Sequence, residues 1–86
     1  MSMDFKLITP ERLVAEGQAE IIIAPGEDGE LGFLSQHTPI LSTLKAGRIQ
    51  IKQSGSYKEF DVDNGFIEVL ENRVNILTNK VREQDN

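Results

Sequence analysis

Closely spaced glycines constrain the fold of this chain more than any other feature of the sequence. Gly26, Gly29 and Gly32 follow one another at three-residue spacing inside residues 25–47, which read PGEDGELGFLSQHTPILSTLKAG. Glycine frees the backbone from most steric limits, so such spacing is typical of tight turns between short strands and not of a helix. This stretch therefore predicts a chain of short extended segments.

Apolar side chains recur mostly with a period of two or in brief runs. Residues 48–52 alternate cleanly, and Ser54-Gly55-Ser56 predicts a hairpin loop after them. Asp63-Asn64-Gly65 predicts a turn, because Asn and Gly adopt positive φ at low cost. Strands are expected over 5–9, 13–16, 19–24, 31–34, 40–44, 48–52, 57–62, 66–70 and 73–78. The pattern predicts an all-β protein, an antiparallel sandwich or flattened barrel of about ten short strands.

Length and composition narrow the class of protein. A chain of 86 residues makes one domain, and the absence of cysteine excludes disulfides, thiolate metal sites and cysteine nucleophiles. The net charge of −5 argues against binding to a phosphate backbone and fits docking onto a basic or neutral protein surface. The longest apolar run, residues 21–24, falls far short of the ~18 residues that a membrane span needs, so we expect a soluble chain.

The end of the chain differs in composition from the rest. Residues 80–86 are polar and show no apolar periodicity, which predicts a frayed tail too short to bury a helix. The predicted organisation is a β-sandwich domain over residues 1–80 followed by a polar C-terminal tail over residues 81–86.

Two patterns invite a chemical interpretation. The glycine spacing lacks the Lys-Ser/Thr ending of a phosphate-binding loop, since Gly32 leads into an apolar pair, so turns are favoured over nucleotide binding. His37, the only histidine, lies near Ser35 and Glu30. It is read as an ordinary loop residue, as a partner contact, or as part of a Ser-His-acid site; one histidine does not decide between them. We expect no cofactor and no bound metal.

One strand carries apolar side chains on both faces. Glu68 lies between Ile67 and Val69 and shares its face with Phe66 and Leu70. This face is either a solvent face that its neighbours partly cover, or a face that becomes buried when a partner docks. The pattern leaves both interpretations open.

Several separated motifs also resemble one protein family in their order. They are Leu7-Ile8-Thr9-Pro10-Glu11, Gly17, Ile23-Ala24-Pro25-Gly26, Gly29-Glu30-Leu31-Gly32, His37-Thr38-Pro39-Ile40-Leu41-Ser42, Leu44-Lys45-Ala46-Gly47 and Gly65-Phe66-Ile67-Glu68-Val69. Together they resemble the N-terminal β-sandwich domain of the epsilon subunit of F-type ATP synthases. The resemblance spans nearly the whole chain.

The resemblance implies a non-catalytic subunit of the central stalk, the rotor. Such a subunit links gamma to the c-ring and couples proton flow to ATP synthesis, at the cytoplasmic face of the bacterial inner membrane rather than at a chloroplast thylakoid. Longer relatives continue into a C-terminal helical hairpin, which we expect to be absent here, whether the chain is naturally short or truncated. The alternative is a free-standing β-sandwich adaptor that binds another protein or peptide, with a strand edge as one means of binding it.

By the same resemblance, Glu30, Leu31 and Gly32 correspond to the loop that meets the c-ring. The ring loops present basic residues in this family, so a carboxylate at Glu30 is electrostatically favourable.

Three further residues are assigned to the stalk by resemblance. His37 and Ser42 fall at positions that lie toward gamma, and Thr9 belongs to a strand-end motif that approaches the stalk. Many relatives have Pro-Gly where this chain has Ser35-Gln36, which affects the expected shape of the loop facing gamma but not the fold.

Overall fold

The protein is described by a computed structural model that covers residues 2–35 and 38–83. Over these residues it contains ten strands and no helix, which confirms the predicted all-β class. The strands are β1 (Met3–Ile8), β2 (Leu13–Ala19), β3 (Ile21–Gly26), β4 (Gly29–Leu34), β5 (Ile40–Leu44), β6 (Gly47–Gln53), β7 (Ser56–Val62), β8 (Gly65–Leu70), β9 (Arg73–Thr78) and β10 (Val81–Glu83).

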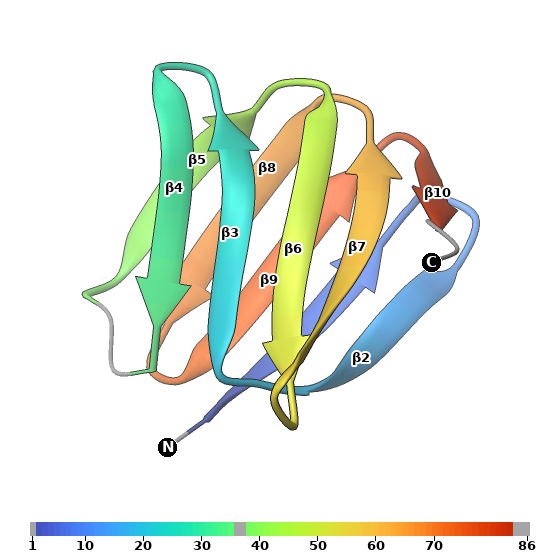
Figure 1. Cartoon of the computed structure of the whole chain (residues 1–86). Helices are drawn as coiled ribbons and strands as arrows, with labels where there is room; N and C mark the ends of the chain where they lie inside the picture. The colour runs from blue at the N-terminus through green and yellow to red at the C-terminus, as the bar shows by residue number, and fades with distance from the viewer. Residues whose placement is uncertain (1, 36–37, 84–86) are drawn as a thin grey trace.

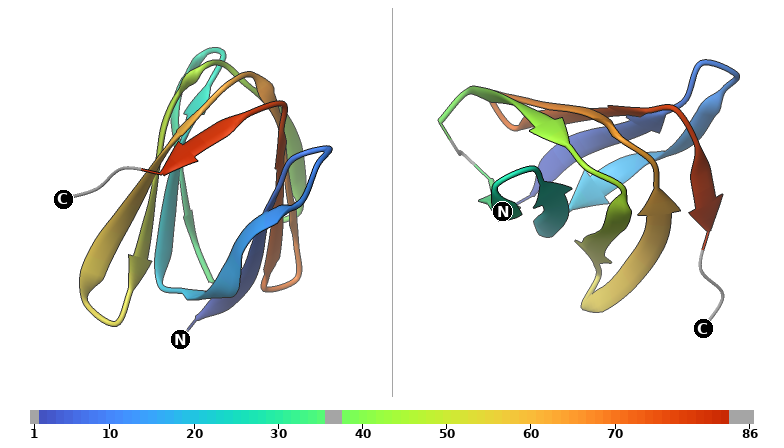
Figure 2. Two further views of the ribbon diagram at one scale, coloured as in Figure 1. Left: turned by 90° about the vertical axis from the view of Figure 1, so that its right-hand side faces the viewer. Right: turned by 90° about the horizontal axis from the view of Figure 1, so that it is seen from above.

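The strands form two layers that face each other, as Figures 1 and 2 show. One layer, here the front layer, has the order β4-β3-β6-β7-β10, and the back layer has the order β5-β8-β9-β1-β2. The layers join at one corner, where Gly26 of β3 pairs with Leu44 of β5. Neighbouring strands are antiparallel except β1 and β9, which run parallel. The arrangement is the predicted sandwich with its two sheets joined into one.

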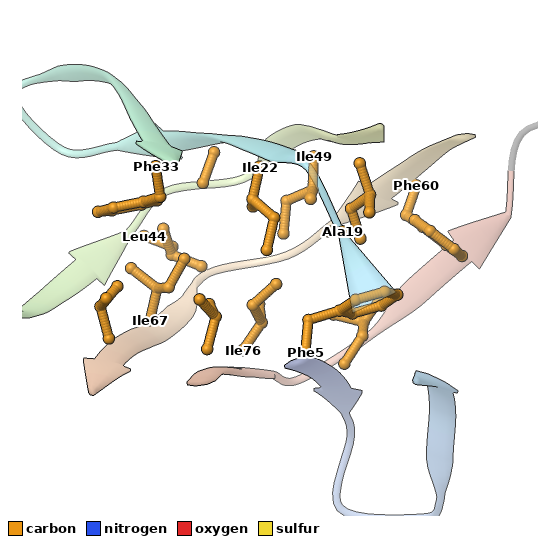
Figure 3. Close-up of a cluster of buried hydrophobic side chains, with 14 of the residues drawn as sticks. Phe5, Ala19, Ile22, Phe33, Leu44, Ile49, Phe60, Ile67 and Ile76 are labelled. Carbon is orange, nitrogen blue, oxygen red and sulfur yellow. The ribbon is translucent and has the colours of Figure 1, made fainter. Parts of the chain in front are cut away.

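The core lies between the layers and consists of the inward-facing side chain of every second residue (Figure 3). On β6 these are Ile49 and Ile51, and on β8 they are Ile67 and Val69, in keeping with the period of two in the sequence. Burying each such side chain is worth about 1.5–3 kcal/mol. The core therefore holds the layers together without help from apolar side chains on the outer faces.

One predicted turn has the expected backbone, and a second has a different cause. Ser54 and Gly55 both have positive φ, 49° and 81°, which suits the tight hairpin between β6 and β7. The turn at Asn64-Gly65 was predicted from positive φ, and this explanation is wrong because neither residue has it. Gly65 is required instead by close approach: a Cβ there would lie 2.0 Å from the carbonyl oxygen of Leu77.

Strand boundaries differ from the prediction near Gly17. The strand expected over residues 13–16 continues to Ala19, because Gly17 lies in the ladder opposite Phe5 instead of ending the strand. The run expected as one strand over 19–24 is divided, since Ala19 ends β2 and Ile21 begins β3. Glycine marks a strand end in many sequences, but within an antiparallel pair it also fits against an aromatic neighbour.

The prediction of a frayed tail is wrong at its beginning. Val81–Glu83 form β10, which pairs antiparallel with β7, and Val81 packs against the core opposite Val62. The amide of Asp63 also donates to the carbonyl of Lys80, 3.0 Å away. Three residues with one apolar side chain are too few to show a period, so the sequence gives no signal for this strand. Residues 84–86 lie outside the described part of the chain.

We predict that Gly65→Ala destabilises the protein by roughly 1–3 kcal/mol, because the added methyl group must displace the backbone of β9. The matched change is Gly32→Ala, where a Cβ would meet nothing within 4 Å. Urea unfolding followed by circular dichroism should give a lower midpoint for the first variant and a midpoint near wild type for the second. Equal midpoints would contradict the close-approach argument.

Candidate docking surface

Apolar side chains form a continuous row across the outer face of the back layer. The strand register places Leu13 beside Ile8, Ile8 beside Leu77, Leu77 beside Phe66, and Phe66 beside Thr43. Leu13, Leu77 and Phe66 are 44%, 45% and 52% exposed, and Ile8 is half-buried. We call Leu13, Ile8, Leu77 and Phe66 the apolar row, and the polar Thr43 lies at its end. The apolar row crosses β2, β1, β9 and β8, and so joins the first two strands of the chain to two strands far along the sequence.

Leu41 extends the apolar row along β5. It is 69% exposed and shares the outer face with Thr43, two residues further along the strand. Soluble monomers rarely expose contiguous apolar patches of this kind unless the patch binds something. Since the core already holds the layers together, the apolar row fits a surface that another protein covers.

Another part of this outer face, away from the apolar row, carries charged side chains. An open hollow of about 530 Å³ lies over β2, β1 and β9, and its charged side chains are Asp4, Lys6, Glu16 and Arg73. Two negative and two positive groups cancel, so the hollow selects no ligand by charge. Within the lining of this hollow, the side-chain amide of Gln18 donates to the Asp4 carboxylate at 2.9 Å.

A smaller hollow lies where the apolar row meets the turns. Its volume is about 280 Å³, and we call it the turn-end hollow. It is formed by the β3–β4 hairpin, the end of β5, the start of β8 and the end of β9. Its lining residues are Glu27, Thr43, Leu44, Asn64, Gly65, Phe66, Leu77, Thr78 and Asn79.

A buried hydroxyl fixes the rim of the turn-end hollow. The Thr78 side chain is 4% exposed, and its Oγ1 lies 2.8 Å from the carbonyl oxygen of Asp63. The carbonyls of Asn64 and Lys80 lie slightly further away, at 3.3 and 3.4 Å. One hydroxyl proton serves one strong acceptor, and Asp63 is the nearest. The side-chain amide of Asn79, in the β9–β10 turn, donates to Asn64 Oδ1, in the β7–β8 turn, at 3.0 Å. This hydrogen bond joins the two turns.

The three residues expected to meet the c-ring lie together on β4, in the front layer. Glu30 pairs with Pro25, and Gly32 pairs with Ile23. Glu30 and Gly32 are both exposed on the outer face. Leu31 is half-buried and packs against the core, beside Ala24. A partner at this place would therefore contact Glu30 and the bare backbone at Gly32 more directly than the Leu31 side chain.

The residues expected to face gamma are not gathered by the structure into one surface. Ser42 is half-buried on the opposite side of β5 from Leu41, and its hydroxyl lies 3.4 Å from the Thr43 carbonyl. Thr9 is buried, and its hydroxyl bonds with the backbone of Arg12 at 3.3 Å inside the β1–β2 turn. His37 lies outside the described residues.

The sequence pattern found the face of Phe66 but missed the rest of the apolar row. Leu13, Ile8 and Leu77 each lie on strands whose other face is also apolar or half-buried, so alternation alone does not mark them as exposed. Only the register across β2, β1, β9 and β8 shows that they are neighbours.

The described residues hold no group of three or more His, Cys, Asp or Glu side chains arranged to bind a metal ion. Nor does any helix within 2–35 and 38–83 reach the length and hydropathy of a membrane span. The class of protein is defined by the fold, a ten-stranded β-sandwich with exposed apolar side chains on the outer face of one layer.

The particular family follows from comparison with known proteins. The family described as "ATP synthase, Delta/Epsilon chain, beta-sandwich domain" matches residues 2–84, and the chain belongs to this family. ATP synthase epsilon chains of Desulforamulus reducens and Desulforudis audaxviator are 35% and 41% identical over 92% and 85% of this chain. The chloroplastic epsilon chain of Emiliania huxleyi is 39% identical over 96% of it. The aligned part makes up 60%, 53% and 64% of these three relatives, respectively.

Solved structures share the fold. A chain of the Euglena gracilis mitochondrial ATP synthase, in a structure of its OSCP/F1/c-ring part, aligns with 95% of this chain and 53% of its own length at a TM-score of 0.90. A chain of the Tetrahymena thermophila central stalk/c-ring structure aligns with 96% of this chain and 67% of its own at 0.81. Both are 19% identical to it, so they confirm the sandwich fold and nothing finer.

We predict that Thr78→Val lowers the free energy of unfolding by about 1–2 kcal/mol, because it leaves the Asp63 carbonyl without its closest donor. Thr43→Val is the control, since Thr43 is exposed. Urea unfolding of the two variants and wild type measures the difference. If Thr78→Val unfolded with the same free energy as Thr43→Val, the Thr78 hydroxyl would not stabilise the β7–β8 turn.

Proposed function

We propose that this protein is a non-catalytic central-stalk (rotor) subunit of a proton-translocating F-type ATP synthase, where it links gamma to the c-ring. Membership of the delta/epsilon family supports the role, and the exposed apolar row is the observation that carries it. The similar chains of E. gracilis and T. thermophila come from structures of an OSCP/F1/c-ring assembly and of a central stalk/c-ring assembly, which agrees with both partners. A free-standing adaptor is not favoured.

The two layers offer two separate contact surfaces. The apolar row, on the back layer, is proposed to dock on gamma. Ser42, His37 and Thr9 are proposed as further gamma contacts from the family resemblance alone. Glu30, Leu31 and Gly32, on the front layer, are proposed to meet the c-ring. A close-packed sandwich has low compressibility, so a force applied to one layer reaches the other. The subunit would couple proton flow to ATP synthesis by holding its two neighbours in fixed relation.

The proposed location is the membrane-facing end of the stalk, peripheral to the membrane. Bacterial and chloroplastic epsilon chains are both among the similar proteins. The cytoplasmic face of a bacterial inner membrane is the favoured site, and the thylakoid the second. The proposed domain is the sandwich itself, and it includes β10 in addition to residues 1–80.

We predict that the double variant Phe66→Gln/Leu77→Gln binds purified gamma at least about tenfold more weakly than wild type, because buried aromatic and aliphatic anchors dominate interfaces. The control is Tyr57→Gln, since Tyr57 is 44% exposed but lies on the outer face of the front layer. Isothermal titration calorimetry gives the dissociation constants. Unchanged binding by the double variant, together with a folded circular dichroism spectrum, would reject the apolar row as the gamma surface.

We predict that Glu30→Lys weakens attachment to the c-ring without altering the fold, since Glu30 is exposed. The physical reason is that the introduced lysine would repel the basic residues expected on the c-ring loops, which the Glu30 carboxylate attracts. The measurement is proton pumping and ATP synthesis in membranes reconstituted with the variant, compared with Glu11→Lys at an exposed site in the β1–β2 turn. Normal coupling with Glu30→Lys would count against the ring contact.

A further inference from the structure

We infer that the turn-end hollow receives a cationic side chain, lysine or arginine, from the protein that covers the apolar row. The inference rests on the proposed function, in which that protein is gamma. It adds the chemistry of one anchoring contact to the apolar row. Four observations carry it: the walls of the hollow, its charge, its size and its rigidity.

The walls suit the aliphatic stem of a long cationic side chain. Phe66 and Leu77 line the hollow from the end of the apolar row, and Leu44 lines it from the core side. Lysine and arginine lay their methylene stems along such surfaces while the charged group stays among polar atoms. The exposed Phe66 ring adds an attraction, because the face of an aromatic ring is electrostatically negative.

The charge of the hollow selects a cation. Glu27 is the only lining residue with a formal charge, and within residues 2–35 and 38–83 its carboxylate makes no ion pair. Other carboxylates near the middle of each sheet are already engaged: Glu59 lies 3.4 Å from Arg48, and Glu68 accepts from Asn75 at 3.2 Å. Glu27 is therefore an unpaired anion at the end of the apolar row, and a docking partner completes its pairing.

The size and position of the hollow suit a single side chain. Its volume of about 280 Å³ is close to the lower limit of typical small-molecule sites, which measure roughly 300–1,000 Å³. It also opens directly onto Phe66 and Leu77, so any protein lying on the apolar row brings side chains to its mouth. A single long side chain therefore fits both the space and the position.

The hollow is already formed before any partner binds. The Thr78 hydroxyl holds the β7–β8 turn, and the Asn79–Asn64 hydrogen bond closes the rim. Neither turn has to be reordered on binding, which reduces the entropic cost of association. An anchor of this kind adds affinity, and it also fixes the position of the partner along the apolar row.

The test compares Glu27→Gln with Glu16→Gln for binding to purified gamma, by calorimetry at several salt concentrations. Glu16 is the matched control because it is an exposed carboxylate on the same face, remote from the turn-end hollow. We expect Glu27→Gln to raise the dissociation constant roughly tenfold and to lower its salt dependence, since a charge-assisted hydrogen bond is lost. Glu16→Gln should stay within about twofold of wild type.

The outcomes separate this inference from the proposed function. Wild-type protein that is folded yet does not bind gamma would reject the proposed function itself. Wild-type binding that is matched by Glu27→Gln, in both dissociation constant and salt dependence, would overturn the cation site and leave the rotor role standing. Weaker binding of Glu27→Lys than of Glu27→Gln would further support a cation in the hollow, because the lysine adds repulsion to the lost attraction.

Discussion

Burial of one face of every strand is the constraint on which the rest of the structure depends. Side chains such as Ile22, Ile49, Ile67 and Ile76 are withdrawn completely from water, and they fix which residues of each strand point outward. A shift of one residue in any ladder would exchange the two faces, so the core also sets the composition of the surface. The apolar row is exposed because its residues hold the alternate positions of strands whose register the core has already determined.

Prediction from the sequence succeeded where a signal is local and failed where it depends on pairing. Alternation marked β6, β7, β8 and β9 well, because each strand is apolar on its buried face over several residues. It missed β10, where Val81 alone packs inward, and it misread Gly17 as a strand end. The role of Gly65 was also beyond reach, since the nearby carbonyl belongs to Leu77, twelve residues later. The candidate site shows the same limit: Phe66 was suspected from its own strand, while Leu13 and Ile8 become its near neighbours only through three further ladders.

The two proposed contacts differ in character, and the difference suits a subunit between unlike neighbours. The back layer presents apolar side chains, and Glu27, in the β3–β4 turn of the front layer, lies at their end without an ion pair among the described residues. This combination gives affinity through burial and orientation through charge. The front layer presents Glu30 and an uncovered glycine at an edge strand. Contacts of this second kind are weaker and more sensitive to salt, as expected where a surface rests on the polar loops of another assembly.

The parallel ladder between β1 and β9 has a consequence for how the chain is made. Residues 4–8 find their partners at residues 73–77, near the opposite end of the sequence. During synthesis β1 leaves the ribosome long before β9, its parallel partner, exists, so the back sheet stays open until residues 73–77 have been translated. Loop closure over such a distance slows two-state folding. In the interval, β1 has one edge whose backbone groups lack their partner strand, and such an unpaired edge is prone to pair with other chains.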